Sequence, residues 1–182
     1  RDMDMSFQVE GKVAVVTGGS SGIGLAAVEI LVAEGAKVAW CGRDEARLAA
    51  SKLYILEKYP HANIYINICN VLDKEDVKRF ARDVKQNLGN VDMLINNAGQ
   101  GRVSNFENTQ DEDWMKEIEL KYFSVLHPVR AFLNDLKQSA CGSITNVNSL
   151  LALQPEPHMI ATSSARAALL NLTHSLAHEF TQ

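Results

Sequence analysis

The sequence predicts an α/β fold with a doubly wound parallel sheet, in three layers of helices, sheet and helices. Five short strand-like runs alternate with helical patterns, and runs such as Val13–Val16 are solidly apolar, as in strands buried on both faces. A glycine-rich turn joins the first run directly to the first helix. Right-handed crossovers between parallel strands give a doubly wound sheet. Because such sheets bind ligands at the carboxyl ends of their strands, we expect the ligand there.

The first half of the chain alternates strand, helix, strand, helix and strand. Gly35 fits a helix C-cap, Asp44 fits an N-cap, and Pro60 stops the second helix. The expected elements are Val13–Val16, Ile23–Glu34, Val38–Cys41, a helix from Asp44 to about Tyr59, and Ile64–Ile68.

The second half continues the same alternation. Apolar residues recur at helical spacing through the helix that starts at Asp73 and ends at Gly89, and its inward face should carry Val77, Phe80, Val84 and Leu88. The later elements are Asp92–Ile95, a long helix from about Asp111 to Lys137, Ser143–Val147 and a helix over Ala161–Phe180. With 182 residues and no internal repeat, we expect one domain over residues 1–182.

Composition disfavours several classes of function. The net charge is -4 and no Lys/Arg run occurs, so we expect no nucleic-acid partner. Apolar runs fall far below the roughly 18 residues of a membrane span, and Arg1–Met5 does not resemble a secretory signal. Cys41, Cys69 and Cys141 form no Cys/His cluster, so we expect no metal site and interpret them as small buried hydrophobes near strand ends. An odd cysteine count indicates a cytoplasmic location.

The turn after the first strand has the properties of a phosphate-binding loop. It must be tight, approach a phosphate closely and pack its helix near the strand, and each demand excludes a Cβ somewhere. Free N–H groups at the helix N-terminus then face the anion, and two serines add hydroxyl donors. The predicted cofactor-binding residues here are Thr17, Gly18, Ser20, Ser21, Gly22, Ile23 and Gly24.

The pattern Thr-Gly-x-x-x-Gly-Ile-Gly resembles the cofactor signature of the short-chain dehydrogenase/reductase family. A second family signature, Asn96–Gly99, follows the fourth strand, and the resemblance extends from about Val9 to Gln182. It implies a Rossmann-like NAD(P)-binding domain, with Asn97, Ala98 and Gly99 beside the adenine ribose.

The end of the second strand indicates which dinucleotide binds. A carboxylate there would accept from a free ribose 2′-OH and repel a 2′-phosphate. The sequence instead reads Cys41-Gly42-Arg43, and the planar fork of Arg43 suits a phosphate. We interpret Asp44 as a helix N-cap, and a solvated loop charge at Arg43 stays an alternative. Asn70 stands where the family usually has an adenine-binding Asp. We therefore expect NADP(H), with NAD(H) as the alternative.

The catalytic pattern of the family is altered. Ser149 follows the fifth strand and matches the family's Ser, but Thr162 and Arg166 occupy the Tyr-x-x-x-Lys positions. A threonine hydroxyl titrates far above a phenol, whereas Arg166 retains the charge that would hold the nicotinamide ribose. The position of the family's Asn in the long helix is assigned to Glu119.

Other groups near the cleft are candidate proton donors. His158 precedes Thr162 by four residues, and Tyr122 lies one helical turn after Glu119. A loop histidine and a packing tyrosine are the alternative interpretations. Glu119 itself would act as an acid if burial raised its pKa.

The resemblance implies an NAD(P)(H)-dependent oxidoreductase acting on a carbonyl or hydroxyl group of a small molecule. The alternative is a catalytically degenerate member that binds NADP(H) as a sensor or a structural or dimerisation partner. The chain ends after the helix that carries Arg166, so the family's substrate loop and last strands are expected to be absent from it. In the family the long and final helices form a dimer interface, and we expect a homodimer or homotetramer. Packing onto the sheet is the alternative role for Ala165, Ala168, Leu169, Leu172 and Leu176.

Overall fold

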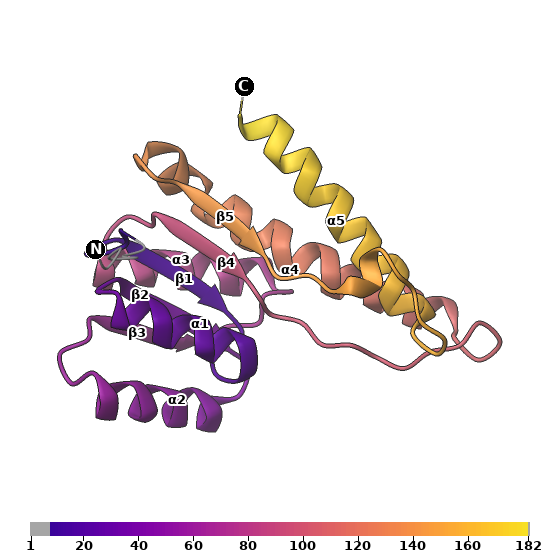
Figure 1. The fold of residues 1–182 in the computed structure, drawn as a ribbon, viewed down its shortest axis with the longest axis horizontal. Helices are drawn as coiled ribbons and strands as arrows, with labels where there is room; N and C mark the ends of the chain where they lie inside the picture. The colour runs from indigo at the N-terminus through magenta and orange to yellow at the C-terminus, as the bar shows by residue number, and fades with distance from the viewer. Residues whose placement is uncertain (1–7, 182) are drawn as a thin grey trace, which may run out of the picture.

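The computed structural model describes residues 8–181, so Arg1–Met5 lies outside the described residues. Five parallel strands form one sheet in the order β3-β2-β1-β4-β5. They are β1 (Val13–Thr17), β2 (Lys37–Gly42), β3 (Ile64–Ile68), β4 (Met93–Asn96) and β5 (Ser143–Asn146). The order reverses between β1 and β4, which creates a crevice at their carboxyl ends. The predicted doubly wound parallel sheet is confirmed (Figure 1).

Helices cover both faces of the sheet. One hydrophobic cluster joins the sheet to α1 (Gly22–Ala33) and α2 (Glu45–Lys58). A larger cluster joins it to α3 (Lys74–Leu88), α4 (Asp111–Gln138) and α5 (Ile160–Phe180). These bounds lie within a few residues of the expected ones, and a short 3₁₀ helix, η1 (Leu150–Ala152), was not anticipated.

The smaller cluster lies directly beneath the glycine turn. Trp40 of β2 is fully buried there, and its Nε1 donates to Ser51 Oγ of α2 at 2.9 Å. A Cβ added to Gly19 would come within 2.5 Å of Trp40 Cβ. The turn can therefore pack directly against Trp40 only because residue 19 has no Cβ.

The burial of the final helix decides for several of its apolar residues between a dimer interface and packing within the chain. Ala165, Leu169 and Leu172 are buried, and Leu169 and Leu172 belong to the larger core cluster, so these positions pack inward. The expected oligomer stays a prediction.

The expectation that the cysteines are buried holds for Cys41 and Cys69 but is wrong for Cys141, which is exposed in the turn after α4.

Residues 8–181 contain neither a candidate membrane-spanning helix nor a cluster of metal-ligating side chains. No helix in that range is both long and apolar enough to cross a membrane. Within the same range, no group of His, Cys, Asp and Glu side chains converges as metal ligands would.

The packing of Phe132 in the larger core leads to a prediction about stability. Phe132 of α4 is 2% exposed and meets the Phe80 ring edge-on, with centroids 6.5 Å apart. Because Phe132→Ala leaves a cavity, we expect it to lower the free energy of unfolding by about 3–5 kcal/mol in urea denaturation. Phe106→Ala is the matched control, since Phe106 is 76% exposed, and we expect a change below about 0.5 kcal/mol. Equal losses in both variants would contradict this placement of the core.

Candidate active site

The ends of β1 and β4 are fastened together at the crevice. Thr17 Oγ1 accepts from the backbone N–H groups of Asn97 at 3.0 Å and Ala98 at 3.1 Å. Asn97 Nδ2 donates to the Gly18 carbonyl at 3.0 Å. Gly18 has φ +65°, and a Cβ there would lie 2.9 Å from Ala98 Cα. The two sequence motifs therefore form one unit in space.

The first helix begins without the caps that the next two helices have. Asp44 and Asp73 accept from backbone N–H groups at the starts of α2 and α3. Within the described residues, α1 has neither a side-chain cap from Ser21 nor an acidic residue in its first turn. Its terminal N–H groups thus stay available to an anion. Gly22, with φ +54°, and the exposed Ile23 stand at this end of the helix.

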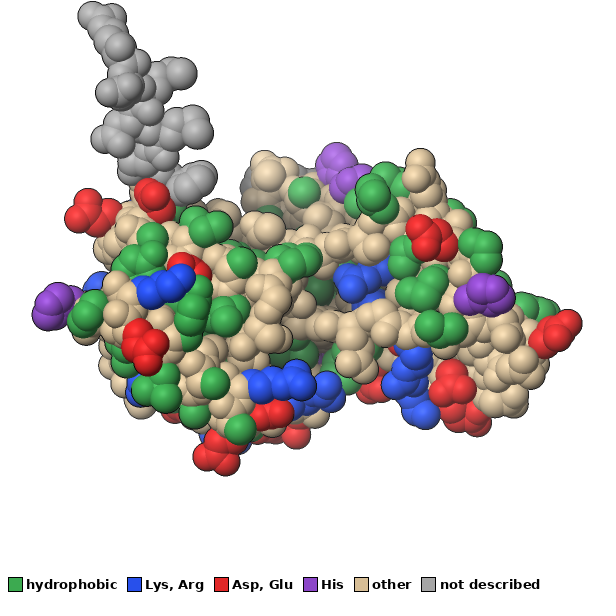
Figure 2. Space-filling view, turned by 60° about the horizontal axis from the view of Figure 1, so that its bottom comes forward, with side chains coloured by type: hydrophobic (Ala, Val, Ile, Leu, Met, Phe, Trp, Pro, Cys, Tyr) green, Lys and Arg blue, Asp and Glu red, His purple; other side chains and the backbone are tan. Residues whose placement is uncertain are grey.

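A cleft of about 980 Å³ lies above the carboxyl ends of β1 to β4. Figure 2 shows a face that is hollowed near its middle, with Lys and Arg side chains beside the hollow. Six predicted cofactor-binding residues line the cleft: Gly18, Ser20, Arg43, Asn70, Ala98 and Gly99. Thr17, Gly24 and Asn97 shape it from beneath, through the contacts of the glycine turn with β4.

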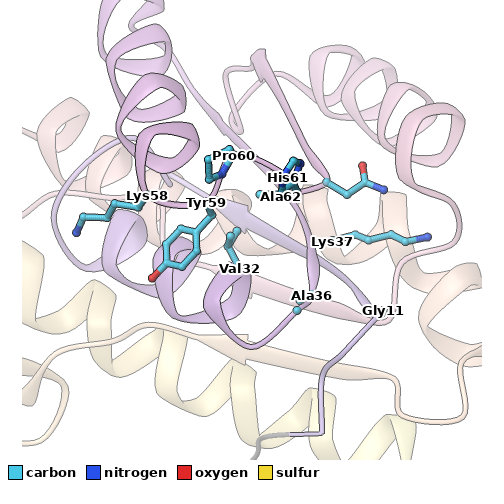
Figure 3. A pocket seen from close by; sticks show the side chains of 11 residues that line it. Gly11, Val32, Ala36, Lys37, Lys58, Tyr59, Pro60, His61 and Ala62 are labelled. Atoms are coloured by element: carbon cyan, nitrogen blue, oxygen red, sulfur yellow. The ribbon is translucent and has the colours of Figure 1, made fainter.

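A second pocket, of about 510 Å³, lies beside Gly11, Gly35 and Lys37, away from the glycine turn (Figure 3). In the close view the Lys37 and Lys58 side chains extend outward on opposite sides of it. Ligands of open α/β sheets bind at the other ends of the strands. We therefore assign the site to the larger cleft.

Arg166 lies beside the cleft between β4 and β5. Its guanidinium comes 3.8 Å from where a Gly99 Cβ would be, and Nη1 donates to the Val147 carbonyl at 3.2 Å. Nε is buried and has no hydrogen-bond partner among residues 8–181. Burial lowers the pKa of Arg166, and the Glu117 carboxylate opposes that shift.

Ser149 caps η1 at the carboxyl end of β5. Its Oγ accepts from the Leu151 N–H at 3.2 Å, so the hydroxyl hydrogen can point elsewhere. The adjacent Asn148 donates from Nδ2 to the Arg166 carbonyl at 3.1 Å. This bond ties the segment of Ser149 to α5.

The Thr162 hydroxyl is occupied within the protein. Oγ1 accepts from the Arg102 N–H at 3.2 Å and lies 2.8 Å from Glu117 Oε2 and 3.1 Å from the Arg102 carbonyl. Its single hydrogen goes to one of these two acceptors. Thr162 therefore holds the segment after β4 and the Glu117 carboxylate in place.

A buried ion pair of α4 completes this part of the site. Lys121 Nζ lies 3.1 Å from Glu117 Oε2 and also donates to the Gln100 carbonyl. The two side chains are 1% and 3% exposed. Burial lowers the pKa of Lys121, Glu117 opposes this shift, and the positive charges of Arg166 and Arg102 add to it.

Glu119 does not join this cluster. It is exposed, because a position two residues from Glu117 points to nearly the opposite side of a helix, whereas Glu117 and Lys121 share one face. The assignment at Glu119 missed the buried pair, although extending the buried face of α4 back from Val125 by one and two turns leads to Lys121 and Glu117. A charged residue at a core position was the available signal.

The other two candidate donors lie apart from the pair. His158 is exposed in the loop before α5, with φ 63°, where its carbonyl accepts from the Ser104 N–H. Tyr122 is partly buried and packs against the larger core. The structure thus brings Ser149, Thr162 and Arg166 to one edge of the sheet, together with the unpredicted Glu117 and Lys121.

Residues 12–182 match the family model described as short chain dehydrogenase. The chain belongs to the short-chain dehydrogenase family. It is 31% identical over 175 residues to a 3α-hydroxysteroid dehydrogenase of Mediterraneibacter gnavus, covering 96% of this chain and 70% of that protein.

Solved structures of the family are similar as well. An NADPH-bound short chain oxidoreductase of Pseudomonas aeruginosa PAO1 with an atypical catalytic center is 55% identical, with a TM-score of 0.92 over 93% of this chain. The L-sorbose reductase of Gluconobacter frateurii, complexed with NADPH and L-sorbose, is 31% identical with a TM-score of 0.91 over 96%. The chain spans 66% of the length of each of these two structures.

The glycine turn of this family member leads to a second prediction. A Cβ at position 24 would lie 2.2 Å from the Gly18 carbonyl oxygen and 2.5 Å from Asn97 Nδ2. We expect Gly24→Ala to destabilise the protein by about 1–3 kcal/mol in urea denaturation, because turn and helix must move apart. At Gly101 the added Cβ would meet the flexible end of Met159 at 3.4 Å. A Gly101→Ala variant as unstable as Gly24→Ala would refute the argument.

Proposed function

We propose that this protein is an NADP(H)-dependent oxidoreductase that transfers hydride between the dinucleotide and a carbonyl or hydroxyl group of a small molecule. The observation that carries the proposal is the 980 Å³ cleft at the switch point, where the glycine turn is fastened to Asn97 and Ala98. In open α/β sheets this is where ligands bind.

The residues present fit a dinucleotide. The uncapped start of α1 leaves N–H groups for the pyrophosphate, with Ser20 and Ser21 as added donors. Arg43 lines the cleft at the end of β2, which suits a ribose 2′-phosphate. Asn70 would contact the adenine, and Ala98 and Gly99 would lie along its ribose.

We assign the reacting end of the cleft to the side where Arg166 and Ser149 lie. Arg166 would hold the nicotinamide ribose, and its buried, unpartnered Nε is consistent with a ligand that accepts a hydrogen bond there. Ser149 would donate its free hydroxyl hydrogen to the substrate oxygen. A bound nicotinamide dinucleotide supplies or takes up the hydride.

The relatives support NADP(H) as the dinucleotide. Two of the similar solved structures hold NADPH. NAD(H) is the alternative, and titrations with NADPH and NADH distinguish the two. A small-molecule substrate, a homodimeric or homotetrameric assembly and a cytoplasmic location belong to the same proposal.

One observation favours a second candidate function. The Thr162 hydroxyl is occupied by Glu117 and Arg102, so the position of the family's proton-donating tyrosine has no free donor. A degenerate member that binds NADP(H) without chemistry, as a sensor or structural partner, would look the same at this position. Turnover separates the two candidates.

The proposed function is tested on the complete protein in two steps. NADPH and NADH are first titrated by fluorescence, and NADPH should bind more tightly. Loss of NADPH absorbance is then followed with L-sorbose, which one relative's name gives, and with a 3-oxosteroid, the oxidised form of the 3α-hydroxysteroid in another relative's name. Binding without turnover on these and related carbonyl compounds would favour the degenerate member, and no binding would refute both.

Cofactor preference yields a third prediction. We expect Arg43→Ala to raise the Kd for NADPH about 10- to 100-fold and to leave the Kd for NADH nearly unchanged, because a charge-assisted hydrogen bond to the 2′-phosphate is lost. The readout is the same fluorescence titration. Arg82→Ala, an exposed arginine of α3, is the matched control and should change neither Kd. Equal weakening for both dinucleotides in Arg43→Ala would remove the assignment.

A further inference from the structure

The buried pair of Glu117 and Lys121 demands an explanation beyond stability. Removing a carboxylate and an ammonium group from water costs several kcal/mol per ion, and a buried pair often stabilises less than apolar residues of the same size. Their positions on α4 continue the face that carries Val125 and Val129 into the core. Strongly perturbed pKa values cluster at functional sites, so a costly buried pair beside the cleft is a candidate for function.

The pair lies between two hollows of the molecule. On one side, Lys121 Nζ donates to the carbonyl of Gln100, a residue that lines the cofactor cleft together with Gly99. On the other side, Glu117 lines a separate pocket of about 240 Å³ with Arg102 and Asp113. The 3.1 Å contact between Glu117 Oε2 and Lys121 Nζ therefore connects the wall of the cleft to an opening at the surface.

Lys121 has a hydrogen to give, whereas Thr162 does not. A lysine ammonium carries three N–H bonds, and two of those on Lys121 go to the Gln100 carbonyl and to Glu117. The third has no acceptor among residues 8–181. The Thr162 hydroxyl is turned toward Glu117 or Arg102 and serves to position the carboxylate.

We propose that Lys121 donates the proton to the substrate oxygen through one water, and that Glu117 returns a proton to it from the pocket that it shares with Arg102. This relay rests on the proposed function. In reduction the carbonyl carbon accepts the hydride, and the C=O π electrons become a lone pair on oxygen. That oxygen takes a proton from the water, which takes one from Lys121, leaving a neutral amine. A solvent proton then reaches the amine by way of the Glu117 carboxylate, so atoms and charge balance.

The charges around Lys121 tune it for this exchange. Glu117 faces it from α4, Arg102 from the segment after β4, and Arg166 from α5. Burial lowers the pKa of Lys121, and Arg166 and Arg102 lower it further, against the opposing effect of Glu117. A lower pKa makes the ammonium a better acid near neutral pH. Reduction should accordingly weaken as pH rises through this pKa.

The test uses two replacements of Lys121 in the complete protein. We expect Lys121→Met and Lys121→Arg both to lower kcat about 10²- to 10⁴-fold with L-sorbose or a 3-oxosteroid. Arginine keeps the charge opposite Glu117, so this variant should fold, yet it hardly releases a proton. The Kd for NADPH, from fluorescence, should change less than about 3-fold. Lys52→Met, on the exposed side of α2, is the control.

Glu117→Gln tests whether kcat follows the pKa of Lys121. Removing the carboxylate removes the group that raises the pKa of Lys121, so this pKa should fall further, and the pH profile of kcat should move to lower pH with it. ¹⁵N NMR of the Lys121 Nζ measures the pKa without any substrate. Glu112→Gln, in the exposed first turn of α4, is the control and should move neither.

Each outcome decides the relay. A Lys121→Arg variant with unchanged kcat, a Glu117→Gln profile that does not move, or a Lys121 ammonium that titrates like the exposed lysines would overturn it. The NMR result stands even if none of the probes is turned over. If the wild-type protein fails to bind NADPH, the proposed function falls as well, whereas NADPH binding and turnover that survive Lys121→Met overturn the relay alone.

Discussion

The close approach of the β1 and β4 ends is the constraint on which the rest of the site depends. Thr17 Oγ1 receives two backbone N–H groups of the β4 end, and Asn97 returns a hydrogen bond to the Gly18 carbonyl. These bonds form only if residue 18 has no Cβ, because its backbone lies against Ala98. Trp40 sets the height of the turn from below, so a well-packed apolar core fixes the geometry of a polar cleft.

The close approach of the β1 and β4 ends also positions the residues around Arg166, Thr162 and Lys121. Once β4 is fastened to β1, the segment Gly99–Arg102 leaves the sheet beside Arg166 and reaches Thr162 and Lys121. The loop then meets the start of α5 through the Ser104 N–H, which donates to the His158 carbonyl, and Ser104 Oγ, which accepts from the Ala161 N–H. Cofactor cleft and buried charges therefore share one backbone scaffold.

The sequence predicted the elements that local physics determines. Alternating apolar runs and helical periods located the strands and helices to within a few residues. The glycine turn predicted a ligand site at the carboxyl ends of the strands, which is the edge of the sheet where the large cleft lies. Glu119 was chosen by position along the chain, whereas the face of α4 that meets α5 is set by packing over many turns. Thr162 likewise looked like a weak donor, and its hydrogen bonds to Arg102 and Glu117 join segments far apart in sequence.

The altered residues act as one unit, which bears on how the family pattern could be restored. Thr162 is 1% exposed and its hydroxyl fits between Arg102 and Glu117. A tyrosine ring at this position would overpack the site and displace the Glu117 carboxylate, leaving Lys121 without its counter-charge. Replacing Thr162 and Arg166 by the family's residues would therefore remove the present arrangement without recreating the other. Contacts of about 3 Å couple Thr162, Glu117 and Lys121, and Arg166 is linked to Glu117 by charge, so a substitution at one of these positions changes the surroundings of the others.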